Sequence, residues 1–320
     1  MSAKKALICG VSGQDGAYLS KLLLEKGYEV FGGSRNAQTG SFRNLEVLHI
    51  KKEIQLISVN ITDFRNTLQS ISKIKPDEIY NLSGQSSVGL SFEQPVETLE
   101  SIGVGTLNLL EAIRFTQSPI KLYNAGSSEC FGDTLGEAAT ELTAFRPRSP
   151  YAVAKATAYW QVANYREAYK IHACTGILYN HESPLRKENF VTKKIISAAC
   201  RMHKGSNERL FLGNINISRD WGWAPEYVEA MWLMIQQEKA DDFIIATGKT
   251  HSLEDFISFT FSKLGLNWKD HVSSDPNLIR FTDLRYGHAN PEKAEKILGW
   301  KAKVGLKEII EKMIDAELHN

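Results

Sequence analysis

Short apolar runs and amphipathic stretches alternate along roughly the first 180 residues of this chain. The apolar runs predict β-strands at residues 6–9, 28–32, 54–59, 78–82, 120–124 and 172–179. The stretches between them have apolar residues at helical spacing, which predicts helices at residues 17–26, 64–74, 104–116 and 152–169. Strands and helices in this alternation form β-α-β units. The sequence therefore predicts an α/β fold with a doubly wound parallel (Rossmann) sheet.

The pattern changes after about residue 180, where polar loops separate shorter helices and strands. We expect a first domain over residues 1–179, joined by part of segment 214–248, and a smaller α/β C-terminal domain over 180–320. An amphipathic segment after Trp300 predicts a closing C-terminal helix. These features favour two regions of unequal size over a single repeated unit.

Composition narrows the classes of protein that fit. The chain has 320 residues, a formal net charge of +1 and 42% hydrophobic residues, so neither disorder nor a dedicated nucleic-acid binder is expected. No apolar run approaches the ~20 residues that cross a bilayer, and the apolar start predicts a strand and not a signal peptide. The four cysteines, at 9, 130, 174 and 200, are not at metal-like spacing. We expect reduced core thiols, a cytoplasmic location and no metal, with a catalytic thiol at Cys130 as the alternative.

A glycine-rich turn follows the first predicted strand and opens the first predicted helix. Its glycines, Gly10, Gly13 and Gly16, lie in the sequence GVSGQDG. Glycine lets the backbone turn tightly and approach a pyrophosphate, and the helix amino end supplies amide donors and partial positive charge. Because the strand, the turn, the helix and a second strand occur in the right order, this motif indicates dinucleotide binding.

The end of the second predicted strand bears on the choice of dinucleotide. It reads GSRN at residues 33–36, without the acidic residue that usually holds the ribose hydroxyls of NAD. Arg35 could pair with a 2′-phosphate, which favours NADP over NAD. The alternative is that Arg35 is a solvated loop charge.

Tyr151 and Lys155 open the long helix predicted near residue 152. Positions four apart share one face of a helix, so the ammonium group can approach the phenol. A nearby cation lowers the pKa of a tyrosine, and such a phenol can take a hydroxyl proton while hydride leaves the same carbon. The pair is common by chance, but with the glycine-rich turn it indicates an oxidoreductase-type site.

The strand that ends near residue 125 is followed by two further candidates. Ser127 could hydrogen-bond the substrate oxygen that Tyr151 deprotonates. Glu129 offers a base that a simple oxidoreductase does not need but that an enzyme eliminating water does, since a proton must leave a carbon beside a carbonyl. Read without any relatives, Glu129 could equally be a loop residue that caps a turn.

These residues together resemble the extended short-chain dehydrogenase/reductase superfamily, and within it the GDP-mannose 4,6-dehydratase family. The similarity runs over nearly the whole chain. Its most specific segments are GQDGAYL at 13–19, PRSPY at 147–151, NYREA at 164–168, NHESP at 180–184, FVT at 190–192, RDWG at 219–222 and QQEK at 236–239.

The resemblance implies a mechanism with a role for each catalytic candidate. Tyr151 would deprotonate the hydroxyl at sugar C4, with Lys155 tuning it and holding the nicotinamide ribose, and Ser127 stands where the family has a small hydroxyl residue. Hydride would pass from C4 to NADP. Glu129 would then take the C5 proton and assist loss of the C6 hydroxyl as water, and the hydride would return to C6. The product would be a GDP-4-keto-6-deoxy sugar.

The resemblance also implies binding residues in both domains, the first for NADP and the second for a GDP-sugar. The implied cofactor contacts, with Arg35 and Lys155, are Gly10, Val11, Ser12, Gly13, Gln14, Asp15, Asn60, Ile61, Leu82, Ser83, Gln85, Ser86, His181 and Arg186. The implied substrate contacts are Asn180, Val191, Lys194, Arg219 and Arg280. The three cations among them could neutralise a diphosphate.

Some features leave the substrate and the assembly open. The family often has a double arginine after the second strand where this chain has Arg35 alone, and usually Asp where Asn60 stands. GDP-mannose is the leading substrate, with another GDP-sugar such as GDP-manno-heptose as a contender. A reductase or 4-epimerase would need Ser127 and Tyr151 but not Glu129. A homodimer or homotetramer is expected, with segments 104–116 and 152–169 as candidate contact helices.

Overall fold

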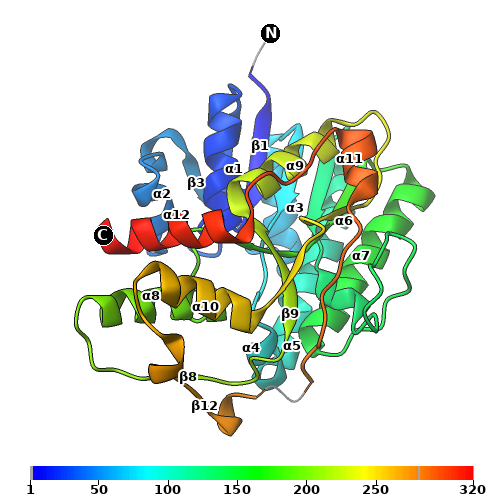
Figure 1. Cartoon of the computed structure of the whole chain (residues 1–320). Coiled ribbons are helices and arrows are strands. Elements are labelled where there is room, and N and C mark those ends of the chain that lie inside the picture. Colours follow the sequence, from blue (N-terminus) through cyan, green and yellow to red (C-terminus); the bar gives the residue numbers. More distant parts are fainter. Residues whose placement is uncertain (1–2, 280–281, 320) are drawn as a thin grey trace.

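A seven-stranded, all-parallel sheet forms the centre of the larger part of the molecule (Figure 1). The computed structural model describes residues 3–279 and 282–319. The strands lie in the order β10-β6-β5-β4-β1-β2-β3. Their bounds are β1 Lys5–Cys9, β2 Glu29–Ser34, β3 Gln55–Ser58, β4 Glu78–Asn81, β5 Lys121–Ala125, β6 Ala173–Leu178 and β10 Phe243–Ile245. The doubly wound parallel sheet predicted from the sequence is confirmed.

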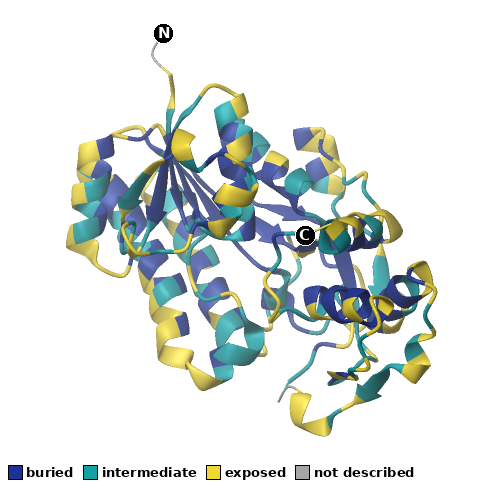
Figure 2. Ribbon diagram, turned by 90° about the vertical axis from the view of Figure 1, so that its left-hand side faces the viewer, coloured by how far each residue is buried: buried dark blue, intermediate teal, exposed yellow. Residues whose placement is uncertain are grey.

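Helices cover both faces of this sheet, and the strands between them are largely buried (Figure 2). One face packs against α1 (Gln14–Glu25) and α9 (Ala224–Gln236) through residues such as Leu19 and Met231. The other packs against α3 (Phe64–Ile74), α6 (Gly105–Thr116) and α7 (Pro150–Tyr169) through residues such as Leu109 and Val162. Burial on both faces explains why the strands are nearly continuous apolar runs.

The seventh strand reaches the sheet by a long excursion. After β6 the chain enters the C-terminal part and returns only at β10, which pairs in parallel with β6 so that Phe243 faces Gly176. Strand β10 and helix α9 fall inside segment 214–248, which sequence analysis joins to the first domain.

The C-terminal part is a second α/β layer around its own core. Helices α8 (Val191–His203), α10 (Leu253–Lys263) and α12 (Leu306–His319) share buried residues such as Ile196, Phe256 and Ile310. The two small sheets have the orders β11-β9-β7 and β12-β8. Their strands are β7 Asn180–Glu182, β8 Leu210–Leu212, β9 Ser218–Trp223, β11 Thr250–Ser252 and β12 Val272–Ser274.

Short elements complete the chain, and some of them were not predicted. Helix α1 begins at Gln14 and not at residue 17, because the last residues of the glycine-rich motif already form its first turn. The predicted helix 104–116 is preceded by further helical segments, which end in a π-helical turn at η2. The remaining elements are α2 Arg43–Val47, η1 Lys51–Glu53, α4 Val88–Glu93, α5 Pro95–Leu99, η2 Glu100–Val104, η3 Ser128–Phe131, η4 Trp268–Asp270, η5 Pro276–Leu278 and α11 Glu292–Leu298.

The four cysteines are buried free thiols. Burial raises the pKa of the Cys130 thiol to about 12, which does not favour the alternative of a catalytic thiolate there. Among residues 3–279 and 282–319, no cluster of three or more His, Cys, Asp or Glu side chains could hold a metal ion. In the same residues we find no helix of the length and apolarity required to cross a membrane.

Candidate active site

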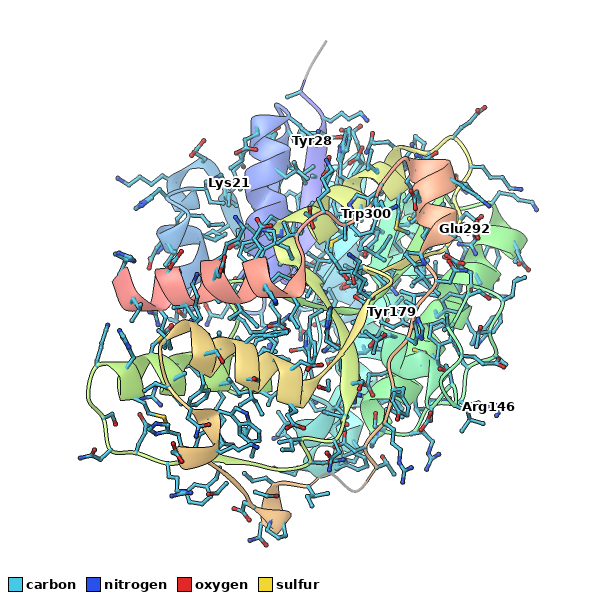
Figure 3. The ribbon with its side chains drawn as sticks, viewed as in Figure 1. Lys21, Tyr28, Arg146, Tyr179, Glu292 and Trp300 are labelled. Carbon is cyan, nitrogen blue, oxygen red and sulfur yellow. The ribbon has the colours of Figure 1, made fainter. Side chains whose placement is uncertain are left out.

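The candidate residues gather where the strands of the large sheet end. In parallel strands all carboxyl ends lie along one edge, and ligands of open α/β sheets bind in the crevice outside that edge. The turn after β1, the loop after β4 and the turn after β5 all leave this edge. Tyr179, which follows β6, lies in the interior of the molecule (Figure 3) and is 3% exposed. The predicted catalytic and cofactor residues are therefore brought to one edge of the sheet.

The glycine-rich turn after β1 is packed so closely that side chains do not fit at two of its positions. Gly10 has φ +89°, and a Cβ atom there would lie 2.7 Å from the Leu82 carbonyl oxygen. A Cβ at Gly16 would lie 2.4 Å from the Gly10 carbonyl oxygen. Within the described chain, no side chain caps the amino end of α1 at Gly13. Backbone amides and space are thus left for an anionic group, so the turn fits a dinucleotide pyrophosphate.

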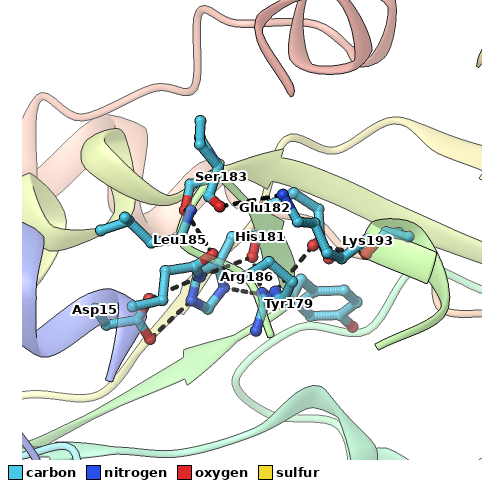
Figure 4. Close-up of polar contacts among 11 residues, drawn as sticks. Asp15, Tyr179, His181, Glu182, Ser183, Leu185, Arg186 and Lys193 are labelled. Carbon is cyan, nitrogen blue, oxygen red and sulfur yellow. Dashed lines mark hydrogen bonds and ion pairs between the residues drawn. The ribbon is translucent and has the colours of Figure 1, made fainter. Parts of the chain in front are cut away.

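A polar cluster joins this turn to the segment after β6 (Figure 4). The Gln14 Nε2 atom donates to the His181 carbonyl oxygen over 3.1 Å, and Ser183 Oγ donates to Gln14 Oε1 over 2.7 Å. The His181 Nε2 atom lies 3.0 Å from Asp15 Oδ2, and the imidazole stacks on the Tyr227 ring. Burial alone would raise the pKa of Asp15, but His181 and then Arg186 bring it down to about 2. The cluster therefore holds a carboxylate at the edge of the turn.

The residues expected around the adenosine half of the cofactor lie beyond β2 and β3. Arg35 follows the end of β2 and is largely exposed, with its Nη1 atom 3.6 Å from Glu97 Oε1 on α5. Asn60 accepts a hydrogen bond from Thr62 Oγ1 over 3.0 Å, and Ile61 is buried. Arg35 thus has an ion-pair partner and is not a purely solvated charge. The pair is weak, because it is long and exposed.

The loop after β4 supplies the residues expected along the nicotinamide side. Gly84 has φ +113°, a conformation that lets the chain turn sharply after Ser83. The Ser83 Oγ atom donates to Asn81 Oδ1 over 2.6 Å, and Gln85 Nε2 donates to the Ser87 carbonyl oxygen over 2.7 Å. These bonds fix the segment from Leu82 to Ser86 against the sheet edge.

Two catalytic candidates lie on the short helix η3, which follows β5. Ser127 caps η3, and its Oγ atom accepts a hydrogen bond from the Glu129 amide over 3.3 Å. Ser127 is also hydrogen-bonded to the Tyr151 phenol, and Glu129 is near enough to that phenol to influence its pKa. The capping role in this turn belongs to Ser127, which leaves the Glu129 carboxylate available for chemistry.

Tyr151 and Lys155 come from the first turns of α7. The helix begins in the way its sequence indicates, since Pro150 occupies the first position and Ser149 Oγ accepts from the Ala152 amide over 3.1 Å. The Lys155 Nζ atom donates to the Ala125 carbonyl oxygen over 2.7 Å and lies 5.8 Å from the centre of the Tyr151 ring. The helix start thus directs both side chains to the end of β5.

The electrostatics of this pair differ from the sequence expectation. Burial raises the pKa of the Tyr151 phenol well above its ordinary value, with the Ser127 hydrogen bond opposing and the Glu129 and Asp15 charges adding to the rise. Burial also lowers the pKa of Lys155 to about 8. A pKa below the ordinary tyrosine value, which the spacing of Tyr151 and Lys155 leads us to expect, is therefore not found, because desolvation by burial is the largest influence on this phenol.

A pocket beside Glu129 brings in one of the predicted substrate cations. Arg219, on β9, is 7% exposed and lines this pocket together with Glu129, Tyr179 and the segment 284–288. Its Nη1 atom donates to the Leu284 carbonyl oxygen over 2.8 Å, and its Nη2 atom lies 3.7 Å from Asp283 Oδ1. Arg219 and Glu129 therefore line one pocket.

The other predicted substrate residues occupy separate positions. Asn180 begins β7 and pairs with Trp221 on β9, two residues along from Arg219. Val191 begins α8, and Lys194 one turn later donates from Nζ to the Phe211 carbonyl oxygen over 2.8 Å. The structure does not bring Lys194 into the pocket lined by Arg219. Arg280 lies outside the described residues.

Several neighbours of the site were not identified from the sequence. The segment 284–288 closes the pocket because its backbone is bonded to β9 and to the loop after η3, with the Ala139 amide donating to the His288 carbonyl oxygen. Glu182 accepts hydrogen bonds from Arg186 and Thr192, and the Tyr227 ring stacks on His181. These are contacts between distant parts of the chain, and no local sequence pattern announces them.

Comparisons with known proteins identify relatives over nearly the whole chain. The family model described as GDP-mannose 4,6 dehydratase matches residues 7–313. GDP-mannose 4,6 dehydratase 1 of Arabidopsis thaliana is 46% identical, over 98% of this chain and 90% of that protein. The human GDP-mannose 4,6 dehydratase is 40% identical, over 98% of this chain and 91% of that protein.

Solved structures share the same architecture. The UDP-glucose 4-epimerase of Thermus thermophilus in complex with NAD matches with a TM-score of 0.85 and 25% identity, over 98% of both chains. The dTDP-glucose 4,6-dehydratase of Bacillus anthracis in complex with NAD matches with a TM-score of 0.86, over 99% of this chain and 97% of the other. At 18% identity, the second match supports the fold alone.

Proposed function

The chain belongs to the GDP-mannose 4,6-dehydratase family, a group of hydro-lyases within the extended short-chain dehydrogenase/reductase superfamily, and we propose that it converts GDP-mannose to GDP-4-keto-6-deoxymannose. One observation carries this proposal beyond family membership. Glu129 shares a site with Ser127 and Tyr151, so a carboxylate stands next to the phenol that acts on the sugar hydroxyl. Removing water needs that carboxylate, whereas reduction or epimerisation at C4 does not.

The residues of the chain divide the proton transfers between them. Tyr151 accepts the proton of the C4 hydroxyl, and the Ser127 hydroxyl positions the substrate oxygen and stabilises the phenolate. Lys155, held against the Ala125 carbonyl oxygen, supplies positive charge 5.8 Å from the centre of the phenol ring. Glu129 removes the C5 proton and returns a proton to the departing C6 hydroxyl, so one carboxylate acts as base and then as acid.

The cofactor proposed for this site is NADP. When bound, its nicotinamide takes up hydride from one sugar carbon and returns it to another. The turn from Gly10 to Asp15 would hold the pyrophosphate, and His181 and Arg186 would flank it. Arg35 would meet the 2′-phosphate by exchanging its long, exposed contact with Glu97 for a charge-assisted bond. If Arg35 stays paired with Glu97 and does not bind a 2′-phosphate, NAD is the alternative cofactor.

The substrate diphosphate and base are proposed to bind along the C-terminal part. Arg219 is the strongest candidate for a diphosphate contact, because it is buried in the wall of the pocket that contains Glu129. We propose that the rest of the GDP-sugar is contacted by Asn180, Val191, Lys194 and Arg280. The Lys194 side chain would rotate away from its contact with β8 to do so. GDP-manno-heptose would bind in the same way, with a longer chain at C6.

A panel of nucleotide sugars tests the proposed reaction. The protein with NADP⁺ is incubated with GDP-mannose, a GDP-linked manno-heptose or UDP-glucose, and products are examined by mass spectrometry while reduced cofactor is followed by absorbance. We expect GDP-mannose to lose one water with no net change in reduced cofactor. Consumption of NADPH would indicate a reductase, and conversion without change of mass would indicate an epimerase.

We also propose that the chain forms a homodimer through α5, η2, α6 and α7. This surface carries large exposed apolar side chains, among them Val96 at 68% and Trp160 at 61% exposure, and the helices that bear them pack side by side. Exposed apolar patches of this kind mark interfaces. Light scattering on wild type and on Trp160→Glu tests the proposal, which requires the wild type to be at least dimeric and the variant to dissociate. A homotetramer would need a second surface.

The expected location of the protein is the cytoplasm, a proposal that the four buried free thiols support. Fractionation of the source cells, followed by detection of the chain, tests it.

A further inference from the structure

One buried carboxylate is bonded to two different parts of the molecule. Glu182, the last residue of β7, is 2% exposed. Its Oε2 atom accepts a hydrogen bond from Arg186 Nε over 2.9 Å and another from Thr192 Oγ1 over 2.7 Å. A carboxylate at this depth needs such donors, because burial without them is costly. The roles proposed above use neither Glu182 nor Thr192.

On one side, these bonds lead to the turn that is proposed to hold the cofactor. Arg186 Nη2 donates to the His181 carbonyl oxygen, and this oxygen also accepts from Gln14 Nε2. The imidazole of the same histidine contacts Asp15. Two consecutive residues of the turn, Gln14 and Asp15, are therefore held by the segment that contains Glu182.

On the other side, the bonds lead to the helix that is proposed to contact the GDP-sugar. Thr192 is 1% exposed and is the second residue of α8, between Val191 and Lys194. The neighbouring Lys193 reinforces the same attachment, since its Nζ atom lies 2.6 Å from Glu317 Oε2 on α12 and 3.4 Å from the Pro184 carbonyl oxygen. The first turn of α8 is thereby tied to the segment 181–186.

We propose that Glu182 is a positioning residue that links the cofactor turn to the amino end of α8, so that NADP and the GDP-sugar strengthen each other's binding. Both sites are bonded to the same segment 181–186, so a displacement that one ligand causes at its own end would be passed through the bonds of Glu182 to the other end. This inference rests on the proposed function, because it takes the two binding regions from it.

The link can be cut without touching the residues proposed to bind either ligand. Thr192→Val removes the hydroxyl donor but keeps the shape of the side chain, and Thr192→Ser keeps the donor. Thr260→Val is the matched control, since Thr260 is equally buried and donates only within α10, to the Phe256 carbonyl oxygen. Ser183→Ala removes one of the bonds between the segment 181–186 and Gln14, leaves the two bonds of His181 in place, and serves if the Thr192 variant does not fold.

Calorimetry on the full-length chain measures the dissociation constant of GDP with and without saturating NADP⁺, and the reverse. The ratio of the two constants is the interaction factor, which must be the same in both directions. We expect an interaction factor of about 5 or more for the wild type, Thr192→Ser and Thr260→Val. For Thr192→Val we expect a factor near one and for Ser183→Ala a reduced factor, with each ligand alone binding close to wild type. A purely structural role would weaken both ligands or the fold and leave the factor unchanged.

A wild-type factor of one overturns the proposal, and so does an undiminished factor in both cutting variants. Loss of the factor in Thr260→Val also overturns it, because general loosening would then be the cause. The proposed function fails separately: a wild type that shows the interaction factor but yields no keto sugar from GDP-mannose refutes the reaction and leaves the link standing.

Discussion

Replacing Lys155 with methionine should stabilise the folded protein while removing its activity. Lys155 is 8% exposed, and burial lowers the pKa of its amine from 10.5 to about 8. One pKa unit corresponds to 1.36 kcal/mol, so the charged amine costs the folded state about 3 kcal/mol at pH 7. The bond that Lys155 donates to the Ala125 carbonyl oxygen returns about 1 kcal/mol, which is lost with the amine. We therefore expect Lys155→Met to raise the free energy of unfolding by about 2 kcal/mol at pH 7.

The difference in the free energy of unfolding between wild type and Lys155→Met should also depend on pH. The folded protein holds the amine at a lower pKa than the unfolded chain does, so the unfolded state binds more protons between about pH 8 and 10.5. Wild-type stability accordingly gains from this residue as the pH rises through that window. The penalty falls to about 1 kcal/mol by about pH 9.5, where wild type and Lys155→Met should be about equally stable.

Urea unfolding followed by circular dichroism at pH 7 and pH 9.5 measures both effects. Lys21→Met is the control, because Lys21 is exposed on α1 (Figure 3) and its loss should change stability little at either pH. Turnover of GDP-mannose is measured on the same preparations. If Lys155→Met were less stable than wild type by the same amount at both pH values, the amine would not be held in a desolvated state and the reasoning would be refuted.

Three further predictions concern the site. Tyr151→Phe removes the proton acceptor and should lower turnover by at least about 100-fold with cofactor affinity retained, measured by product formation and cofactor titration; an unchanged rate would remove the phenol from the mechanism. Glu129→Gln should block water loss more than oxidation at C4, so reduced cofactor accumulates on the enzyme and exchange of the C5 proton with deuterated solvent stops. The exposed Glu137→Gln is its control, and normal C5 exchange in Glu129→Gln would contradict the base assignment. Gly16→Ala places a Cβ 2.4 Å from the Gly10 carbonyl oxygen, which should lower stability by about 1–3 kcal/mol and abolish cofactor binding, whereas Gly305→Ala, with nothing within 4 Å, should do neither. Wild-type cofactor affinity in Gly16→Ala would show that the turn does not need its close packing.

The strands and main helices of the large sheet were accessible from the sequence because each is specified locally. Helix α3 coincides with its predicted span, since its apolar face is regular and Asp63 caps it. The helical segments before α6 were not predicted, because α4, α5 and the π-helical turn are short. These elements also pack against α7, so their apolar residues do not follow one regular pattern. Length and periodicity carry too little information for elements of five or six residues.

The catalytic residues could be identified because motifs fix their spacing, but their environment could not. The four-residue spacing of Tyr151 and Lys155 suggests a cation that lowers the pKa of the phenol. In the fold, desolvation raises the pKa of Tyr151 and lowers that of Lys155. Desolvation depends on how Tyr151 is covered, and it packs against a buried cluster that contains Ile102 and Ala158. Such coverage comes from several elements at once and leaves no trace in the spacing of two residues.

The late arrival of β10 has a consequence for any attempt to divide the chain. A fragment that stops after β6 leaves one long edge of the sheet without its neighbour, because Phe243–Ile245 covers that edge in the intact molecule. Unpaired edges recruit other strands, so the fragment should aggregate. During synthesis the same edge stays unpaired until the chain has passed through β7, α8, β8, β9 and α9.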